Sequence, residues 1–166
     1  MFKRPLRVVP GPGQESVWDY PRPPRIEKVT DRLIVTFAGQ TVAETTEGYR
    51  VLETSHPPVY YFPPDNVRED FLVPEAGRSF CEFKGPANYW SLEVGEARSQ
   101  QAAWNYPETT QPFRKIQGFY AFYASRVEAC WVGDEQVQSQ EGDFYGGWIT
   151  GNIVGPFKGA PGTRGW

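Results

Sequence analysis

Hydrophobic and polar residues alternate along much of the chain, a pattern typical of half-buried β-strands and not of helices. Residues 32–37 and 40–44 alternate in this way on either side of Ala38-Gly39. Two such runs that are separated by two residues ending in glycine predict a β-hairpin. Further strands are predicted at 49–54 and at 59–62, where prolines bracket the second run.

The second half of the chain repeats the pattern with larger aromatic residues. Its predicted strands cover residues 79–84, 88–94, 102–106, 119–123 and 127–132. Residues 64–72 predict one short helical turn, with Asp65 as its cap. Many short strands separated by turns predict a mainly β fold with antiparallel sheets.

Both ends of the chain depart from this alternation. Residues 1–25 are rich in proline and arginine and predict an irregular arm, draped over the domain through Trp18 and Tyr20. Residues 142–166 are rich in glycine with spaced aromatic residues, and predict an extended tail that docks through a few apolar anchors. The β domain itself is expected to cover residues 26–141.

Composition and charge narrow the classes of partner. The 166 residues include 17 Lys and Arg against 20 Asp and Glu, a formal net charge of −3, so the chain lacks the basic surplus that attracts nucleic acid or an anionic membrane. No stretch approaches the roughly 18 apolar residues of a membrane span, and the start lacks the apolar run of a secretory signal. We therefore expect a cytoplasmic protein that binds neither nucleic acid nor membrane, with both cysteines as free thiols.

Three blocks of residues, in order along the chain, carry a family resemblance. They are residues 56–67, 81–89, and 103–107 followed by 118–123. Over roughly residues 20–135 the chain resembles the domain of unknown function 427 family, which also carries a nucleotidyltransferase-like label. The glycine-rich ending resembles that of cyanobacterial members. The resemblance implies a β-tent, in which two antiparallel sheets meet at an angle.

Relatives with the β-tent fold commonly hold structural zinc between two pairs of cysteines. This chain offers only Cys81, Cys130 and His56, without a Cys-x-x-Cys spacing, so we predict no metal and no other cofactor. Nucleotidyl transfer requires paired carboxylates for metal ions, or a glycine-rich phosphate cradle before a helix. The acidic residues at 65–70 fit a solvated turn better than a metal site. Residues 155–163 lack the Gly-Lys-Ser/Thr motif of a phosphate-binding loop.

Two interpretations of Cys81 are open. With His56 as a base and Glu53 to orient that base, the thiol would be a nucleophile for hydrolysis or group transfer. Alternation instead places Cys81 on the apolar side of its strand with Phe83, where it would be a small buried hydrophobe. The second interpretation is the stronger one.

The aromatic residues outnumber the inward positions of a sheet of this size. Neighbours such as Tyr60 and Tyr61 point to opposite faces, so some rings remain to line a cleft. Lys84 stands at a strand end beside aromatic residues, where its charge is placed to meet an anionic ligand. The predicted ligand site combines ring walls with polar groups: Glu53, His56, Tyr61, Lys84, Tyr89, Trp104 and Tyr106.

The leading hypothesis is therefore a protein that binds a small molecule or a peptide in this cleft. The first alternative is an enzyme, a hydrolase or a transferase, that uses Cys81 or a Glu53/His56 acid–base pair. The second is a structural or partner-binding protein. In that case the two terminal arms would hold a homo-oligomer together.

Overall fold

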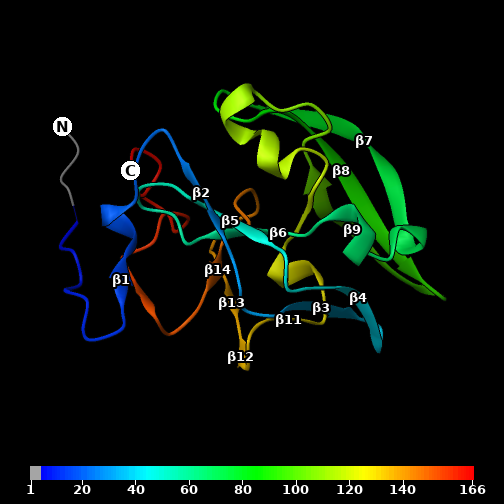
Figure 1. The fold of residues 1–166 in the computed structure, drawn as a ribbon, viewed down its shortest axis with the longest axis horizontal. Coiled ribbons are helices and arrows are strands. Elements are labelled where there is room, and N and C mark those ends of the chain that lie inside the picture. The colour runs from blue at the N-terminus through cyan, green and yellow to red at the C-terminus, as the bar shows by residue number, and fades with distance from the viewer. Residues whose placement is uncertain (1–4) are drawn as a thin grey trace.

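A central antiparallel sheet spans the molecule from β2 to β7 (Figure 1). The computed structural model describes residues 5–166. The strands of this sheet are, in spatial order, β2 (Arg25–Lys28), β5 (Tyr49–Leu52), β6 (Val59–Tyr61), β10 (Tyr120–Phe122), β9 (Ala97–Asn105), β8 (Gly85–Val94) and β7 (Leu72–Cys81). Two backbone hydrogen bonds between Phe62 and Tyr120, at 2.8 and 3.0 Å, join the three-stranded part to the four-stranded part.

A second antiparallel sheet packs against one face of the first. Its strands are, in spatial order, β12 (Glu135–Gln136), β11 (Ala129–Val132), β3 (Leu33–Phe37) and β4 (Gln40–Thr45). The predicted hairpin is confirmed, because β3 and β4 are joined by Ala38 and Gly39. The φ angles of these two residues, 51° and 75°, are those of a type I′ turn, which matches the twist of the strands that it joins.

Alternation along the central strands sends aromatic side chains to both faces of the central sheet. Tyr60 and Phe62 point into the core shared with the second sheet, whereas Tyr61 between them points to the opposite face. Phe122 and Tyr123 divide in the same way. The prediction that neighbouring rings separate to two faces is confirmed, and each face has a buried aromatic cluster of its own.

The C-terminal segment contributes to the core between the two sheets. Trp148 begins β14 (Trp148–Ile149), which pairs with β13 (Gln138–Ser139), and its side chain is 1% exposed. Its ring stacks on Tyr60 with centroids 5.1 Å apart, and its Nε1–H donates to the carbonyl of Phe122 at 2.9 Å. The segment beyond residue 141 thus supplies a core side chain. The domain boundaries expected at residues 25 and 141 stay predictions.

The two irregular ends of the chain meet each other. β1 (Glu15–Ser16) pairs in parallel with β15 (Ile153–Val154). The indole N–H of Trp18 donates to the carbonyl of Pro156 at 2.8 Å, and the ring packs edge-on against Trp166. As expected, Trp18 and the buried Tyr20 pack the N-terminal arm onto the rest of the chain. A homo-oligomer held by these arms stays a prediction.

The structure corrects two local predictions. Asp65 does not cap a helical turn: it lies inside the 3-10 turn η2 (Pro64–Asn66), and no side chain caps that turn. The turn begins instead at Pro64, whose ring fixes φ and which has no N–H to satisfy. The turn between the strands predicted at 79–84 and 88–94, expected at Gly85-Pro86, lies earlier, at residues 82–84, because both Gly85 and Pro86 pair with β7.

The predicted class, a mainly β fold of antiparallel sheets, is confirmed. The remaining helical elements are the 3-10 turns η1 (Val17–Asp19), η3 (Glu69–Phe71), η4 (Gln111–Ile116) and η5 (Ala124–Arg126). Among residues 5–166, no helix has the length and apolar character needed to cross a bilayer. The β-tent arrangement that the resemblance implies stays a prediction.

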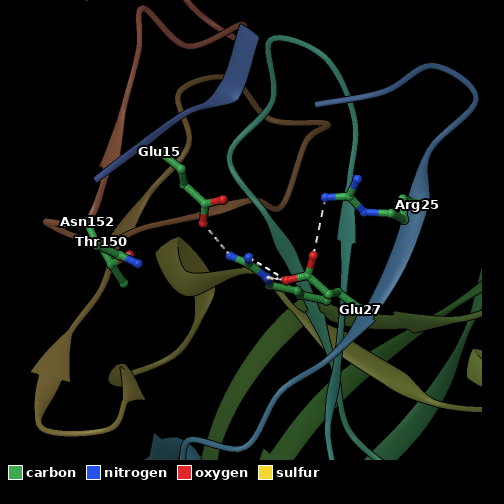
Figure 2. A network of polar contacts seen from close by, with 6 residues as sticks. Glu15, Arg25, Glu27, Thr150 and Asn152 are labelled. Carbon is green, nitrogen blue, oxygen red and sulfur yellow. Dashed lines mark hydrogen bonds and ion pairs between the residues drawn. The ribbon is translucent and has the colours of Figure 1, made fainter. Parts of the chain in front are cut away.

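An ion-pair network ties the N-terminal arm to the central sheet (Figure 2). Arg50 on β5 donates to the carboxylate of Glu15 on β1 at 2.8 Å and to that of Glu27 on β2 at 2.6 Å. Arg25 reaches Glu27 at 3.3 Å from a more exposed position. Burial alone would raise the pKa of Glu27, but the hydrogen bonds and charge of Arg50 outweigh it and lower that pKa. Glu15, Glu27 and Arg50 line a hollow of about 660 Å³, and the guanidinium of Arg50 is paired with both carboxylates, so its role is structural.

Replacing Arg50 with methionine should lower the free energy of unfolding by about 1–3 kcal/mol, because charge-assisted hydrogen bonds are lost. The same change at exposed Arg25 should cost less than about 1 kcal/mol. The pKa of Glu27 is lowered in the folded state. The contribution of the Arg50–Glu27 ion pair to the free energy of unfolding is therefore complete above the unfolded pKa of about 4.3 and is lost as the pH falls below it. In urea unfolding, the deficit of Arg50→Met should therefore shrink in acid. Equal losses for the two variants would contradict this account.

Candidate functional site

A cavity of about 260 Å³ lies on the face of the central sheet that points away from the second sheet. Its floor belongs to β5, β6 and β9, and its walls come from the turn between β7 and β8 and from the C-terminal segment. Every residue that the sequence predicted for a ligand site lines this one cavity: Glu53, His56, Tyr61, Lys84, Tyr89, Trp104 and Tyr106. The structure thus brings together residues that the chain spreads over 53–106.

The floor of the cavity is aromatic. The side chains of Tyr61 and Trp104 reach the cavity because both point to the face of the central sheet that lies away from the second sheet. The ring of Tyr123 packs on that of Trp104 with centroids 4.6 Å apart. Burial, followed by the neighbouring phenol groups, raises the pKa of Tyr123 to about 12 and raises that of Tyr106 as well. Both hydroxyl groups therefore stay protonated at neutral pH and keep a proton to donate.

Lys84 reaches the cavity from the turn between β7 and β8. The next residue, Gly85, has a φ of 111°, and a Cβ there would lie 2.8 Å from the carbonyl oxygen of Glu108, so only glycine fits. The carbonyl of Lys84 accepts from the backbone of Thr110 at 3.2 Å, which anchors the turn. The Lys84 side chain is 9% exposed, and no carboxylate of residues 5–166 lies within 4.0 Å of its ammonium group.

The C-terminal segment forms the wall that faces Trp104. Gly146 lies so close to this ring that a Cβ would be 2.2 Å from its edge, which is why this position requires glycine. The hydroxyl of Tyr123 donates to the carbonyl of Phe144 at 2.9 Å and holds the segment in place. Sequence reasoning missed this wall, which also includes Gln140, Tyr145 and Lys158.

Gln140 fixes the protonation state of His56. The amide Oε1 of Gln140 accepts from the backbone of Gly147 at 3.0 Å, and its Nε2 donates to the carbonyl of Lys158 at 2.7 Å. The Nε2 group, assigned as a donor by these two contacts, lies 3.3 Å from Nδ1 of His56. Nδ1 is therefore the acceptor, and the ring proton sits on Nε2, which faces the carboxylate of Glu53 at 3.5 Å.

The surroundings of His56 also favour the neutral ring. Burial, followed by the positive charges of Lys158, Arg22 and Lys84, lowers its pKa to about 3. The carboxylate of Glu53 does not reverse this effect, because it also faces the guanidinium of Arg22 at 3.5 Å. At neutral pH, His56 is thus an uncharged part of the wall.

Comparison with known proteins adds one finding. The sequence model of a family described as a domain of unknown function (DUF427) matches residues 25–133. The chain belongs to this family. No curated protein matches the chain.

The DUF427 match divides the cavity into two parts. The floor and the Lys84 side lie within residues 25–133, as do all the site residues predicted from the sequence. Gln140, Tyr145 and Lys158 lie beyond it. Only the paired glycines at 146–147 beside aromatic residues hint at this wall in the sequence, since they mark a close backbone approach.

The two thiols of this DUF427 chain differ in burial. Cys130 is 1% exposed, and burial raises its pKa. Cys81 packs with Phe83 against the aromatic cluster on this face of the sheet, on the side that alternation predicts. It is half-buried and not fully buried, because it also lines the cavity.

The proposed set of Cys81, His56 and Glu53 lacks a free base. Nδ1 of His56 accepts from Gln140, and its Nε2–H faces Glu53, so neither nitrogen is left to take a proton from the thiol. Within residues 5–166, no three His, Cys, Asp or Glu side chains form a group that could hold a metal ion.

Two exposed phenylalanines frame the mouth of the cavity. Phe80 is 75% exposed on β7, and Phe144 is 60% exposed on the C-terminal segment. Outside the N-terminal arm, they are the only large apolar side chains among residues 5–166 that stand out as exposed. The exposed part of the lining thus includes two large apolar side chains, whereas Lys84 in the same lining is buried.

His56 is the only histidine of the chain, so its state can be measured directly by nitrogen NMR of the ring. We expect the neutral Nε2–H tautomer from neutral pH down to about pH 4, since the folded pKa is near 3 and the unfolded one about 6.5. The pKa of His56 is lower in the folded state than in the unfolded state. Its contribution to the free energy of unfolding is therefore complete above pH 6.5 and declines as the pH falls, by up to about 1.4 kcal/mol per pH unit.

The variant His56→Gln serves as the matched control for this slope. Between about pH 6.5 and pH 5, where few carboxylates titrate, the wild type should lose stability and the variant should not. A proton on Nδ1, or a folded pKa near 6.5, would contradict the geometry.

Proposed function

We propose that this chain binds a small organic anion with a flat apolar body in the cavity beside Lys84. Lys84 carries the proposal, because the residue is only 9% exposed and no carboxylate of residues 5–166 lies within 4.0 Å of its ammonium group. A lysine that is buried to this extent is normally paired. An anionic group of a ligand supplies the missing partner.

The rest of the cavity supports the same kind of ligand. The rings of Tyr106 and Phe113 lie with centroids 5.8 Å from the Lys84 ammonium, and the floor is formed by Tyr61 and Trp104. Aromatic walls favour a flat apolar body. The protonated Tyr106 hydroxyl, free of hydrogen bonds within the described chain, is available to donate to an anion. At about 260 Å³, the cavity is smaller than the roughly 300–1,000 Å³ typical of sites for drug-sized ligands.

Binding fits the geometry better than catalysis by the Cys81 set does. A thiol nucleophile needs a base within hydrogen-bond reach, and both nitrogens of His56 are engaged elsewhere. Among the described residues that line the cavity, the Lys84 ammonium has no carboxylate partner and the Tyr106 hydroxyl has no hydrogen bond, and both groups can hold an anion.

A thermal-shift comparison of matched acids and amides tests the proposal. Benzoate, 4-hydroxybenzoate and indole-3-acetate should raise the melting temperature, whereas the corresponding neutral amides should not. Replacing Lys84 with methionine should remove one charge-assisted hydrogen bond of about 1.5–3 kcal/mol and weaken acid binding by about 10–100-fold. Tyr106→Phe, which removes only a hydroxyl, should weaken it by less.

Lys115→Met is the matched control, because this exposed lysine on η4 does not line the cavity. Its ligand-induced shift should equal that of the wild type. Circular dichroism of each variant without ligand separates lost binding from lost folding. Equal shifts with acids and amides, or no shift with any acid, would refute the proposal.

A further inference from the structure

We propose that the ligand of this cavity is doubly charged, and that Lys84 and Lys158 together hold its two negative charges. This inference rests on the proposed function and makes it more specific. It follows from a second ammonium group on another wall of the same cavity, contributed by the segment beyond the DUF427 match.

The backbone on both sides of Lys158 is fixed against the cavity wall. Its N–H donates to the carbonyl of Ser55 at 2.8 Å, and its carbonyl accepts from Nε2 of Gln140 at 2.7 Å. The ammonium lies 5.4 Å from the ring centroid of Tyr145, which packs edge-on against His56 at 4.8 Å. The side chain thus starts from an ordered position beside His56.

The two lysines belong to different walls. Lys84 comes from the β7–β8 turn and lies over Tyr106 and Phe113, whereas Lys158 lies over Tyr145. Both lysines nevertheless line the same cavity, together with His56. No carboxylate of residues 5–166 lies within 4.0 Å of either ammonium group.

The acidic side chains of the lining do not neutralise these two charges. Glu53 is engaged by the guanidinium of Arg22 and the Nε2–H of His56, each at 3.5 Å. Glu82 stands exposed in the hairpin turn. The cavity therefore presents two cations that have no carboxylate partner in the described part of the chain, and charge complementarity favours a dianion.

Two chemical sources supply a compact dianion with a flat body: an aromatic dicarboxylate, or a phosphate monoester of an aromatic alcohol. They share the property that matters here, two negative charges attached to a rigid ring. The experiment includes both sources and compares each with a partner of the same shape and one charge fewer.

Isothermal titration calorimetry with the full chain should therefore compare isophthalate, terephthalate and naphthalene dicarboxylate with their monoamides, and phenyl phosphate with its methyl ester. We expect at least one dianion to bind at least about tenfold more tightly than its own singly charged partner, since a second charge-assisted hydrogen bond is worth that much. The arm that shows the preference identifies the source.

Two variants test whether the lysines cause this preference. In Lys158→Met and in Lys84→Met, the ratio of affinities between the preferred dianion and its partner should collapse towards one. In Lys115→Met, which changes the net charge by the same amount outside the cavity, the ratio should stay at its wild-type value. The chain without ligand should show unchanged circular dichroism in each variant.

The outcomes separate this inference from the proposed function. If the singly charged acids bind but no dianion binds more tightly than its singly charged partner, the inference of a doubly charged ligand is wrong and the proposed function stands. A preference for the dianion that persists in Lys158→Met also overturns the inference, because another group then binds the second negative charge. If no acid or phosphate binds at all, the proposed function fails and this inference fails with it.

Discussion

The central sheet of this protein carries aromatic side chains on both faces, and its strands must satisfy two different environments at once. One face packs on the sheet of β3, β4, β11 and β12, with Tyr60, Phe62 and Phe122 in the shared core. The other face carries Tyr61, Trp104 and Tyr123 and is only partly covered. Because β-strands alternate strictly, filling the first face fixes which rings remain for the second. The rings that remain on the second face line the cavity.

The C-terminal segment contributes to both faces. Trp148 fills the core between the sheets, while Gly146, two residues earlier, lies against Trp104 at the cavity. A segment held in the core by a large buried ring is positioned with the precision of the core itself. This explains how a glycine-rich stretch with little regular structure can form an ordered wall for a binding site. It also places Lys158, which follows in the same segment, at the edge of the cavity.

Local patterns predicted the strands and the ring floor because both depend on alternation, which is a property of neighbouring residues. The β3–β4 hairpin follows from Ala38-Gly39 alone. Tyr61 and Trp104 follow from the limited space on the inner face. Alternation placed Cys81 on the correct side of its strand beside Phe83, but it did not predict that the residue is only half-buried. It also has nothing to say about Lys158, whose position depends on contacts with residues about a hundred positions away, such as Ser55.

The sequence by itself determined the antiparallel β class, the turn between β3 and β4, and a set of aromatic and charged residues on the 25–133 side of the cavity. These features depend on side-chain period, turn chemistry and charge, all of which are local. Only the tertiary structure decided that the C-terminal segment forms a wall of the cavity, that Gln140 holds His56 neutral, and that two lysines without a carboxylate partner among residues 5–166 line one cavity. These features depend on packing between distant segments, and the hydrophobic pattern of neighbouring residues does not show which distant residues come into contact.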